Sequence, residues 1–227
     1  MEETQFDVIV IGGGVMGSST AYNAGKRGLK TLLLEQFDFL HHRGSSHGES
    51  RTIRVTYPQH HYYPLVMDSY TLWQEAQAQV GYQVYFPAHH FDMAPSHHPT
   101  MRSLLDYCRA HNIPFQLLRS PEVGQKFSGR INIPDDWVGL SNPHGGIIKP
   151  TKAACMYSMT PDEDFVIDFL GGEFGKDVII GGGFSGHGFK MAPVIGRILV
   201  DLALHGDPNG VDISHFTIAR FRTSSKL

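Results

Sequence analysis

The amino-acid sequence predicts a mixed α/β (α+β) protein, and three observations lead to this fold class. The 227 residues are 41% hydrophobic and 18% charged, which is enough apolar material for one large domain or two small ones. A short β-branched run near the start passes through a glycine-rich turn into a helical pattern. A second pattern of strand, glycine-rich segment and helix lies between residues 177 and 206.

The first 35 residues predict two parallel strands joined by a helix. The run over 6–11 has the pattern of a buried parallel strand, and 30–34 is a second apolar strand. A helix is expected over 18–26, with Gly28 as its stop. The turn between the first strand and the helix comprises Gly12, Gly13, Gly14, Val15, Met16 and Gly17.

This turn has the glycine spacing of a dinucleotide site. Gly12, Gly14 and Gly17 allow a tight turn, close approach of backbone to a pyrophosphate, and close packing of helix on strand. The free N–H groups at the helix N-terminus then meet the phosphates. Glu35 ends the second strand, where it can accept hydrogen bonds from the adenosine ribose. The carboxylate disfavours NADP, while NAD and FAD both remain open.

The remaining elements follow from periodicity and breakers. Residues 41–57 are polar and predict a loop, and 121–150 form a Pro- and Gly-rich region. A last helix is expected to open near Pro193 and close at Gly206. Helices are further expected over 62–79 and 99–110, and strands within 84–93, 164–168 and 177–180.

Composition and short motifs limit the partners. The formal net charge of −3 indicates neither nucleic acid nor an anionic membrane as a partner, and no apolar run is long enough to span a bilayer. Two cysteines, Cys108 and Cys155, cannot form a disulfide framework, which favours a reducing compartment; Cys108 is expected in the core. The 14 histidines include four adjacent pairs but no metal-ligand cluster, so solvated surface histidines and no metal are expected.

The last three residues, Ser225-Lys226-Leu227, form the tripeptide that the peroxisomal import receptor reads at a C-terminus. Residues 221–227 are therefore expected to be a targeting tail, and the localisation is expected to be the peroxisome.

Three further segments carry a family resemblance. They are residues 44–54 (GSSHGESRTIR), 155–165 (CMYSMTPDEDF) and 183–190 (GFSGHGFK). With the N-terminal turn, and in this order, they closely resemble the monomeric sarcosine oxidase and L-pipecolate oxidase family, most of all its plant peroxisomal members. These are FAD enzymes related to D-amino-acid oxidase. The resemblance implies a Rossmann-like FAD-binding domain, discontinuous over 1–57 and 153–220, and a truncated substrate domain over 58–152.

The resemblance also implies the site. FAD would be joined covalently to Cys155, and the substrate carboxylate would be clamped by Arg54 and Lys190, whose cationic groups suit it. Arg51 would lie against the flavin ring, and Tyr157 would border the substrate pocket. The other implied cofactor-binding residues outside the N-terminal turn are Ser46, His47, Gly186, Gly188 and also Lys190.

The implied reaction is oxidation of a secondary amino acid, of the sarcosine or L-pipecolate type, to an imine with reduction of O2 to H2O2. Family chains are much longer, and the pattern passes from about residue 153 to the Cys155 motif as if by a large internal deletion. An inactive truncated isoform that retains at most nucleotide or partner binding is therefore the alternative. An NAD-dependent dehydrogenase would explain the first 35 residues but none of the three other segments.

Overall fold

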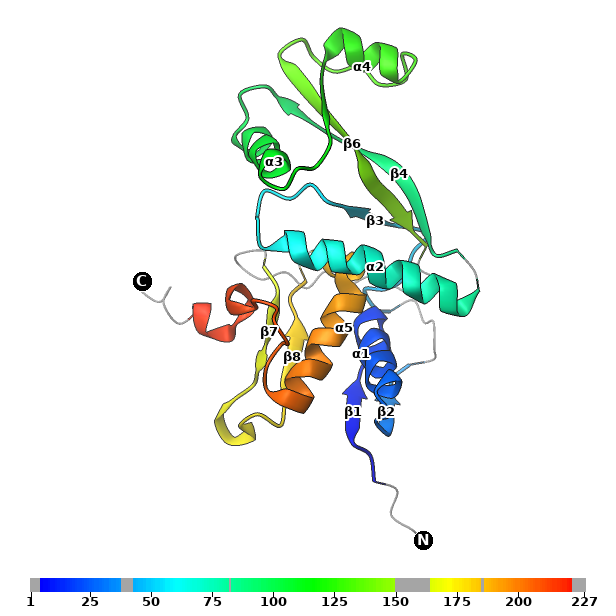
Figure 1. Cartoon of the computed structure of the whole chain (residues 1–227), viewed down its shortest axis with the longest axis vertical. Coiled ribbons are helices and arrows are strands. Elements are labelled where there is room, and N and C mark those ends of the chain that lie inside the picture. The colour runs from blue at the N-terminus through cyan, green and yellow to red at the C-terminus, as the bar shows by residue number, and fades with distance from the viewer. Residues whose placement is uncertain (1–4, 38–42, 82, 150–163, 185, 222–227) are drawn as a thin grey trace. The chain divides into compact units, whose positions relative to one another are not determined.

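The computed structural model describes residues 5–37, 43–81, 83–149, 164–184 and 186–221. They fall into two compact units, the first made of Met1–Arg51, Thr71–Trp73 and Lys149–Leu227, the second of Thr52–Tyr70 and Gln74–Ile148. The strands are β1 Val8–Ile11, β2 Thr31–Leu34, β3 Arg51–Arg54, β4 Tyr85–Pro95, β5 Gln116–Arg119, β6 Trp137–Ile148, β7 Val166–Phe169 and β8 Ile179–Gly182 (Figure 1). The helices are α1 Val15–Lys26, α2 Tyr62–Val80, α3 Pro99–Ala110, α4 Ser120–Lys126 and α5 Gly188–His205, with 3-10 turns η1 Gly172–Phe174, η2 Ser214–Phe216 and η3 Ile218–Phe221.

The first unit contains the strand–helix–strand arrangement that the sequence predicts. β1 and β2 pair in parallel, from Val8 opposite Thr31 to Ile11 opposite Leu34, with α1 as their connection. β7 and β8 form an antiparallel pair. The expectation that β1 is buried on both faces is wrong: its burial alternates, and Ile11 is 85% exposed.

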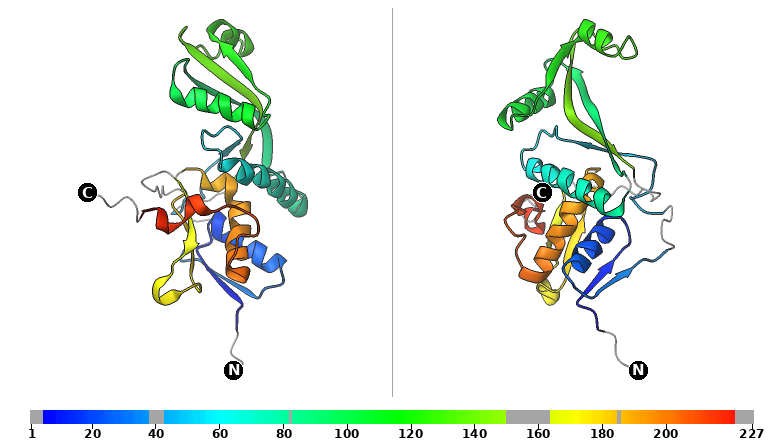
Figure 2. Two further views of the ribbon diagram at one scale, coloured as in Figure 1. Left: turned by 60° about the vertical axis from the view of Figure 1, so that its left-hand side comes forward. Right: turned by 45° about the vertical axis from the view of Figure 1, so that its right-hand side comes forward.

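α1 and α5 lie side by side (Figures 1 and 2). A glycine permits the close approach, because a Cβ on Gly196 of α5 would lie 2.6 Å from the carbonyl carbon of Ser19 in α1. Near the other end of α1, Arg27 forms an ion pair of 2.7 Å with Asp201, a residue of α5 that is 2% exposed. Apolar burial along α5 holds the pair together, since most of that helix is buried.

The second unit is built on an antiparallel arrangement. β6 pairs with β3 and β4, and also with β5. The register of β4 and β6 runs from Tyr85 opposite Ile148 to Pro95 opposite Trp137. α3 is amphipathic, and Cys108 on its apolar side is fully buried, as expected. Burial raises the pKa of the Cys108 thiol to about 11.

Two expectations about elements are wrong, and a third region contains elements that the sequence did not predict. Residues 41–57 contain β3, a strand of only four residues, three of them polar, which is defined by its pairing with β6 and not by a local pattern. The region 121–150 contains most of α4 and all of β6. The last helix begins at Gly188, so Pro193 lies inside it, and the missing N–H of Pro193 removes the usual intrahelical donor to the Phe189 carbonyl.

Candidate functional site

The first unit contains a cavity of about 610 Å³, within the range of small-molecule and cofactor sites. Three parts of the chain that are distant in sequence form its wall: the β1–α1 turn, the segment before β3, and the segment from β8 into α5. The lining residues are Ile11, Gly12, Gly14, Val15, Met16, Gly17, Ser45, Ser46, His47, Arg51, Gly181, Gly182, Gly183, Phe184, Gly186, Gly188 and Phe189.

The β1–α1 turn depends on two of its glycines. Gly12 has φ of +103°, a conformation that side chains rarely adopt, and its N–H donates to the carbonyl of Leu34 at 2.8 Å. A Cβ on Gly17 would overlap the Gly12 carbonyl oxygen. These two contacts let the start of α1 lie directly against the turn.

The cavity wall contains the N-terminal ends of two helices. α1 begins at Val15 and α5 at Gly188, and neither helix has an acidic residue in its first turn. A Cβ on Gly188 would lie 3.0 Å from the Met16 Cε, so the two helix starts come close together. Because unpaired N–H groups and the positive dipole end gather at a helix start, this part of the wall suits an anion such as a pyrophosphate.

Polar side chains organise the same turn. Ser46 is buried, and its Oγ accepts a hydrogen bond from the Val15 N–H at 2.8 Å. The Glu35 carboxylate accepts from the N–H of Gly13 at 2.7 Å and from that of Phe37 at 3.0 Å. These two bonds hold the Glu35 carboxylate directly behind the β1–α1 turn.

Arg51 and Phe189 also line the cavity, and Trp73 supports Phe189 from behind. The Arg51 guanidinium donates to the backbone carbonyls of Ser50 and His47, and it lies 5.5 Å from the centre of the Phe189 ring. Phe189 is stacked on Trp73, with ring centres 6.1 Å apart and planes at 6°. Trp73 also donates its Nε1–H to the Lys190 carbonyl at 2.9 Å, a second contact of this residue with the start of α5 within the first unit.

Most of the cofactor-binding residues expected from the sequence are therefore brought together. Ten of them are among the cavity-lining residues, and Gly13 and Glu35 are hydrogen-bonded directly behind the turn. Lys190 is buried in the first turn of α5. Cys155 and Tyr157 lie outside the described residues. Phe189 and Trp73 were not anticipated as site residues, although Phe189 stands inside the third family segment.

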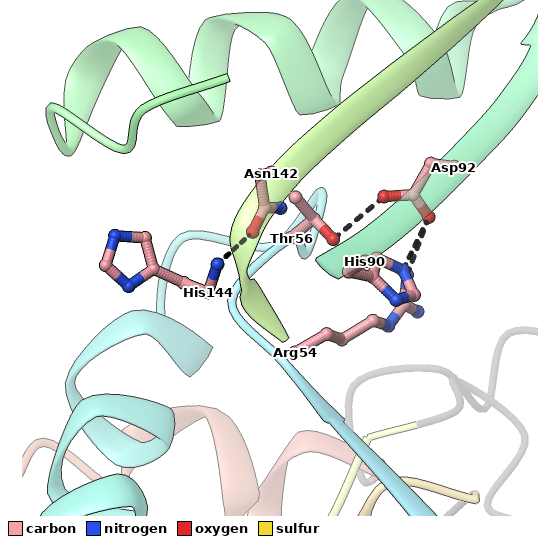
Figure 3. A network of polar contacts seen from close by, with 6 residues as sticks. All are labelled: Arg54, Thr56, His90, Asp92, Asn142 and His144. Carbon is pink, nitrogen blue, oxygen red and sulfur yellow. Dashed lines mark hydrogen bonds and ion pairs between the residues drawn. The ribbon is translucent and has the colours of Figure 1, made fainter. Parts of the chain in front are cut away.

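Arg54 belongs to the second unit, where it is part of a polar network (Figure 3). Its Nη1 donates to the Asp92 Oδ1 at 3.2 Å, and its guanidinium lies 4.9 Å from the centre of the Tyr57 ring. The same Oδ1 is 3.1 Å from the His90 Nε2, and Oδ2 accepts from the Thr56 hydroxyl at 2.9 Å. Asp92 is thus bound through both of its oxygens to three side chains.

The network fixes the charge of Asp92. Burial alone would raise its pKa, but the hydrogen bond and charge of His90, and then Arg54 and Thr56, outweigh burial and hold the pKa below its ordinary value. The expectation of solvated surface histidines is consequently wrong for His90, whose side chain is 19% exposed and bonded to Asp92.

Two features are absent from the described part of the chain. Among these residues, no group of three or more His, Cys, Asp or Glu could hold a metal ion. No helix within the same ranges is long and apolar enough to cross a membrane.

Comparison with known proteins identifies the family. The family model described as FAD dependent oxidoreductase matches residues 7–157. The chain belongs to this FAD-dependent oxidoreductase family. A probable sarcosine oxidase of Arabidopsis thaliana is 34% identical over 394 aligned positions, which cover 99% of this oxidoreductase and 95% of the relative. The chain has 227 residues, so at least 167 of those positions have no counterpart in it.

Other relatives match a smaller part. The monomeric sarcosine oxidase of Bacillus sp. (strain B-0618) is 31% identical over 64% of this oxidoreductase and 37% of its own length. The chain thus spans well under half of that relative. Among solved structures, the L-proline dehydrogenase from P. horikoshii matches with a TM-score of 0.81 at 14% identity, covering 96% of this chain and 98% of that one. This similarity shows the mixed α/β fold that the sequence predicts.

Proposed function

We propose that this oxidoreductase binds FAD and oxidises a secondary amino acid of the sarcosine or L-pipecolate type to an imine, with O2 reduced to H2O2. The observation that carries the proposal is the cavity of the first unit. The N-terminal ends of α1 and α5 line it, and neither helix has an acidic residue in its first turn. Glu35 is hydrogen-bonded to Gly13 in the adjoining turn. The named function of the Arabidopsis relative supports the substrate class.

The residues of the first unit fit the cofactor. The starts of α1 and α5 would hold the pyrophosphate, and Glu35 would accept hydrogen bonds from the adenosine ribose. Arg51 and Phe189 would lie beside the flavin ring, and Cys155 is proposed as the residue of covalent attachment. The chemistry that FAD supplies when bound is acceptance of a hydride equivalent from the carbon beside the amine nitrogen.

The substrate would be held through its carboxylate. Arg54, with its planar set of five donors, and Lys190, with its point charge, are the residues that the family resemblance implies for this carboxylate. Tyr157 is proposed to border the same pocket. The Ser225-Lys226-Leu227 sequence, together with the peroxisomal sarcosine oxidases among the relatives, supports import into the peroxisome, where H2O2 can be degraded.

The visible spectrum of the purified chain, incubated with FAD and then precipitated with acid, tests this proposal. Yellow colour that stays in the precipitate, and moves to the supernatant in Cys155→Ser but not in Cys108→Ser, is expected. Peroxide formation with sarcosine and with L-pipecolate then separates the substrates. A soluble chain that remains colourless would contradict FAD binding.

A second candidate function is supported by a separate observation. At least 167 positions of the Arabidopsis relative have no counterpart here, and Ile9 and Ile11 of β1 are 56% and 85% exposed. A catalytically inactive isoform, which retains at most nucleotide or partner binding, would be consistent with both. Stoichiometric FAD uptake without peroxide formation from any secondary amino acid would favour this candidate.

A further inference from the structure

Arg54 is held in the second unit by a carboxylate that no family motif includes. Asp92 lies on β4 and Arg54 on β3, 38 residues apart, and both strands flank β6 in one sheet. Their side chains are 16% and 25% exposed, so the ion pair is largely shielded from water. Shielding of this kind strengthens the interaction relative to an exposed pair.

Asp92 cannot turn without breaking other contacts. Its Oδ1 is shared between Arg54 and His90, and its Oδ2 accepts from Thr56, which is fully buried (Figure 3). Two residues along β4, His90 points to the same face of the strand as Asp92, which explains why the two meet. The carboxylate is therefore a fixed anchor.

The anchor holds the guanidinium at one of its two terminal nitrogens. Only Nη1 of Arg54 donates to Asp92, out of five N–H donors, while the Tyr57 ring lies against the guanidinium at 4.9 Å. A planar group held at one end and against an aromatic ring has few orientations left. Less side-chain freedom is then lost when a ligand binds to the remaining donors.

We propose that Asp92 is a positioning residue for Arg54: it holds the guanidinium in the orientation that receives the substrate carboxylate, and its charge moderates the strength of that interaction. The proposal rests on the proposed function, in which Arg54 binds that carboxylate. Position and charge are separable, since asparagine preserves the shape of Asp92 without its charge and alanine removes both.

Binding of sarcosine and of acetate to the 227-residue chain, measured by titration calorimetry, tests the two effects. Asp92→Asn is expected to bind more tightly than the unmodified chain, on the order of fivefold, because a like charge near the ligand is gone. Asp92→Ala is expected to bind at least about tenfold more weakly than Asp92→Asn, because Arg54 is no longer oriented. Asp106→Asn is the matched control, since its ion pair with Arg109 on α3 is exposed, and no change is expected there.

A measurement without ligand keeps the test independent of affinity. In the ¹⁵N NMR spectrum, the guanidinium of Arg54, assigned with Arg54→Lys, is expected to rotate slowly in the unmodified chain and in Asp92→Asn. Rotation is expected to be fast in Asp92→Ala.

The outcomes separate the two proposals. If Arg54→Lys weakens carboxylate binding but Asp92→Ala and Asp92→Asn bind equally, the substrate role of Arg54 stands and positioning is overturned. If Arg54→Lys leaves carboxylate binding unchanged, the role proposed for Arg54 fails, and the inference fails with it. Unchanged Arg54 rotation in Asp92→Ala would also overturn positioning.

Discussion

Alanine in place of Gly17 is expected to destabilise the first unit, whereas alanine in place of Gly25 is expected to stabilise it. Both glycines lie in α1, so both substitutions gain about 1 kcal/mol of helix propensity. The surroundings differ. A Cβ at Gly25 meets nothing within 4 Å, while one at Gly17 overlaps the Gly12 carbonyl oxygen.

The size of the destabilisation at Gly17 depends on which atom the new Cβ would overlap. A backbone oxygen in a turn cannot move aside as a flexible side chain would, so the strain at Gly17 is expected near the upper end of the range for overpacking, about 3 kcal/mol. The net loss is then about 2 kcal/mol, against a gain of about 1 kcal/mol at Gly25. At roughly 2–4 °C per kcal/mol for a chain of this size, the two variants should differ in Tm by roughly 6–12 °C.

Thermal unfolding followed by tryptophan fluorescence in a Trp137→Phe background measures this difference, because Trp73 then reports on the first unit. Circular dichroism of the folded variants controls for changes in secondary structure. Equal Tm values for the alanine variants of Gly17 and Gly25 would refute the assignment of the turn's geometry to Gly17.

Three further predictions concern charge and burial. Arg27→Ala leaves the buried carboxylate of Asp201 without its partner, so it is expected to lower the free energy of unfolding by about 2–3 kcal/mol. The control Arg109→Ala breaks an exposed ion pair and is expected to lower it by under about 1 kcal/mol. Urea unfolding measures both values. Burial raises the pKa of the Cys108 thiol to about 11. The contribution of the neutral thiol to stability is therefore complete below the ordinary pKa of 9.0 and is lost as the pH rises to about 11. Over this pH range the urea midpoint of Cys108→Ala should fall less than that of the unmodified chain. The pKa of Asp92 is lowered in the folded chain, so the contribution of its carboxylate to stability is complete above the ordinary pKa of 3.8. This contribution is lost as the pH falls through the lower pKa of the folded state. Asp92→Asn should show no such loss of stability in an acid titration.

The sequence was most informative where local signals determine structure. The range of α3 was predicted to the residue, because proline occupies its first position and its apolar residues recur at helical spacing. The strand–helix–strand unit was predicted for a similar reason: its turn needs glycine at particular positions, and glycine is visible in the sequence.

β6 shows why other elements were missed. Its Pro- and Gly-rich composition gave no prediction of a strand, but two of its glycines allow aromatic side chains of β4 to lie across it. A Cβ on Gly139 would overlap the Phe91 ring, and one on Gly146 would overlap the Tyr85 ring. Glycine is favourable here because of a partner strand some 50 residues away, and no local pattern reports such a partner.

The polar network around Arg54 was out of reach for the same reason. Alternation along β4 places His90 and Asp92 on one face, and this much follows from the period of a strand. That Asp92 meets Arg54 depends on the pairing of β3 and β4 with β6, which is set by the tertiary fold. Motif resemblance could indicate Arg54 but not the carboxylate that orients it.

β1 forms a strand as the sequence predicts, but it is not buried as the sequence predicts. Ile9 and Ile11 follow the pattern of a strand covered on both faces, yet both are exposed in this structure. Ile11 lines the cavity, so a bound dinucleotide would cover part of it. A ligand that binds only the folded chain stabilises it in proportion to RT ln(1 + [L]/Kd), so the first unit would depend on its cofactor more than a fully covered sheet does. The proposed oxidase therefore requires occupancy of this cavity, which an inactive isoform that binds only a partner would not need.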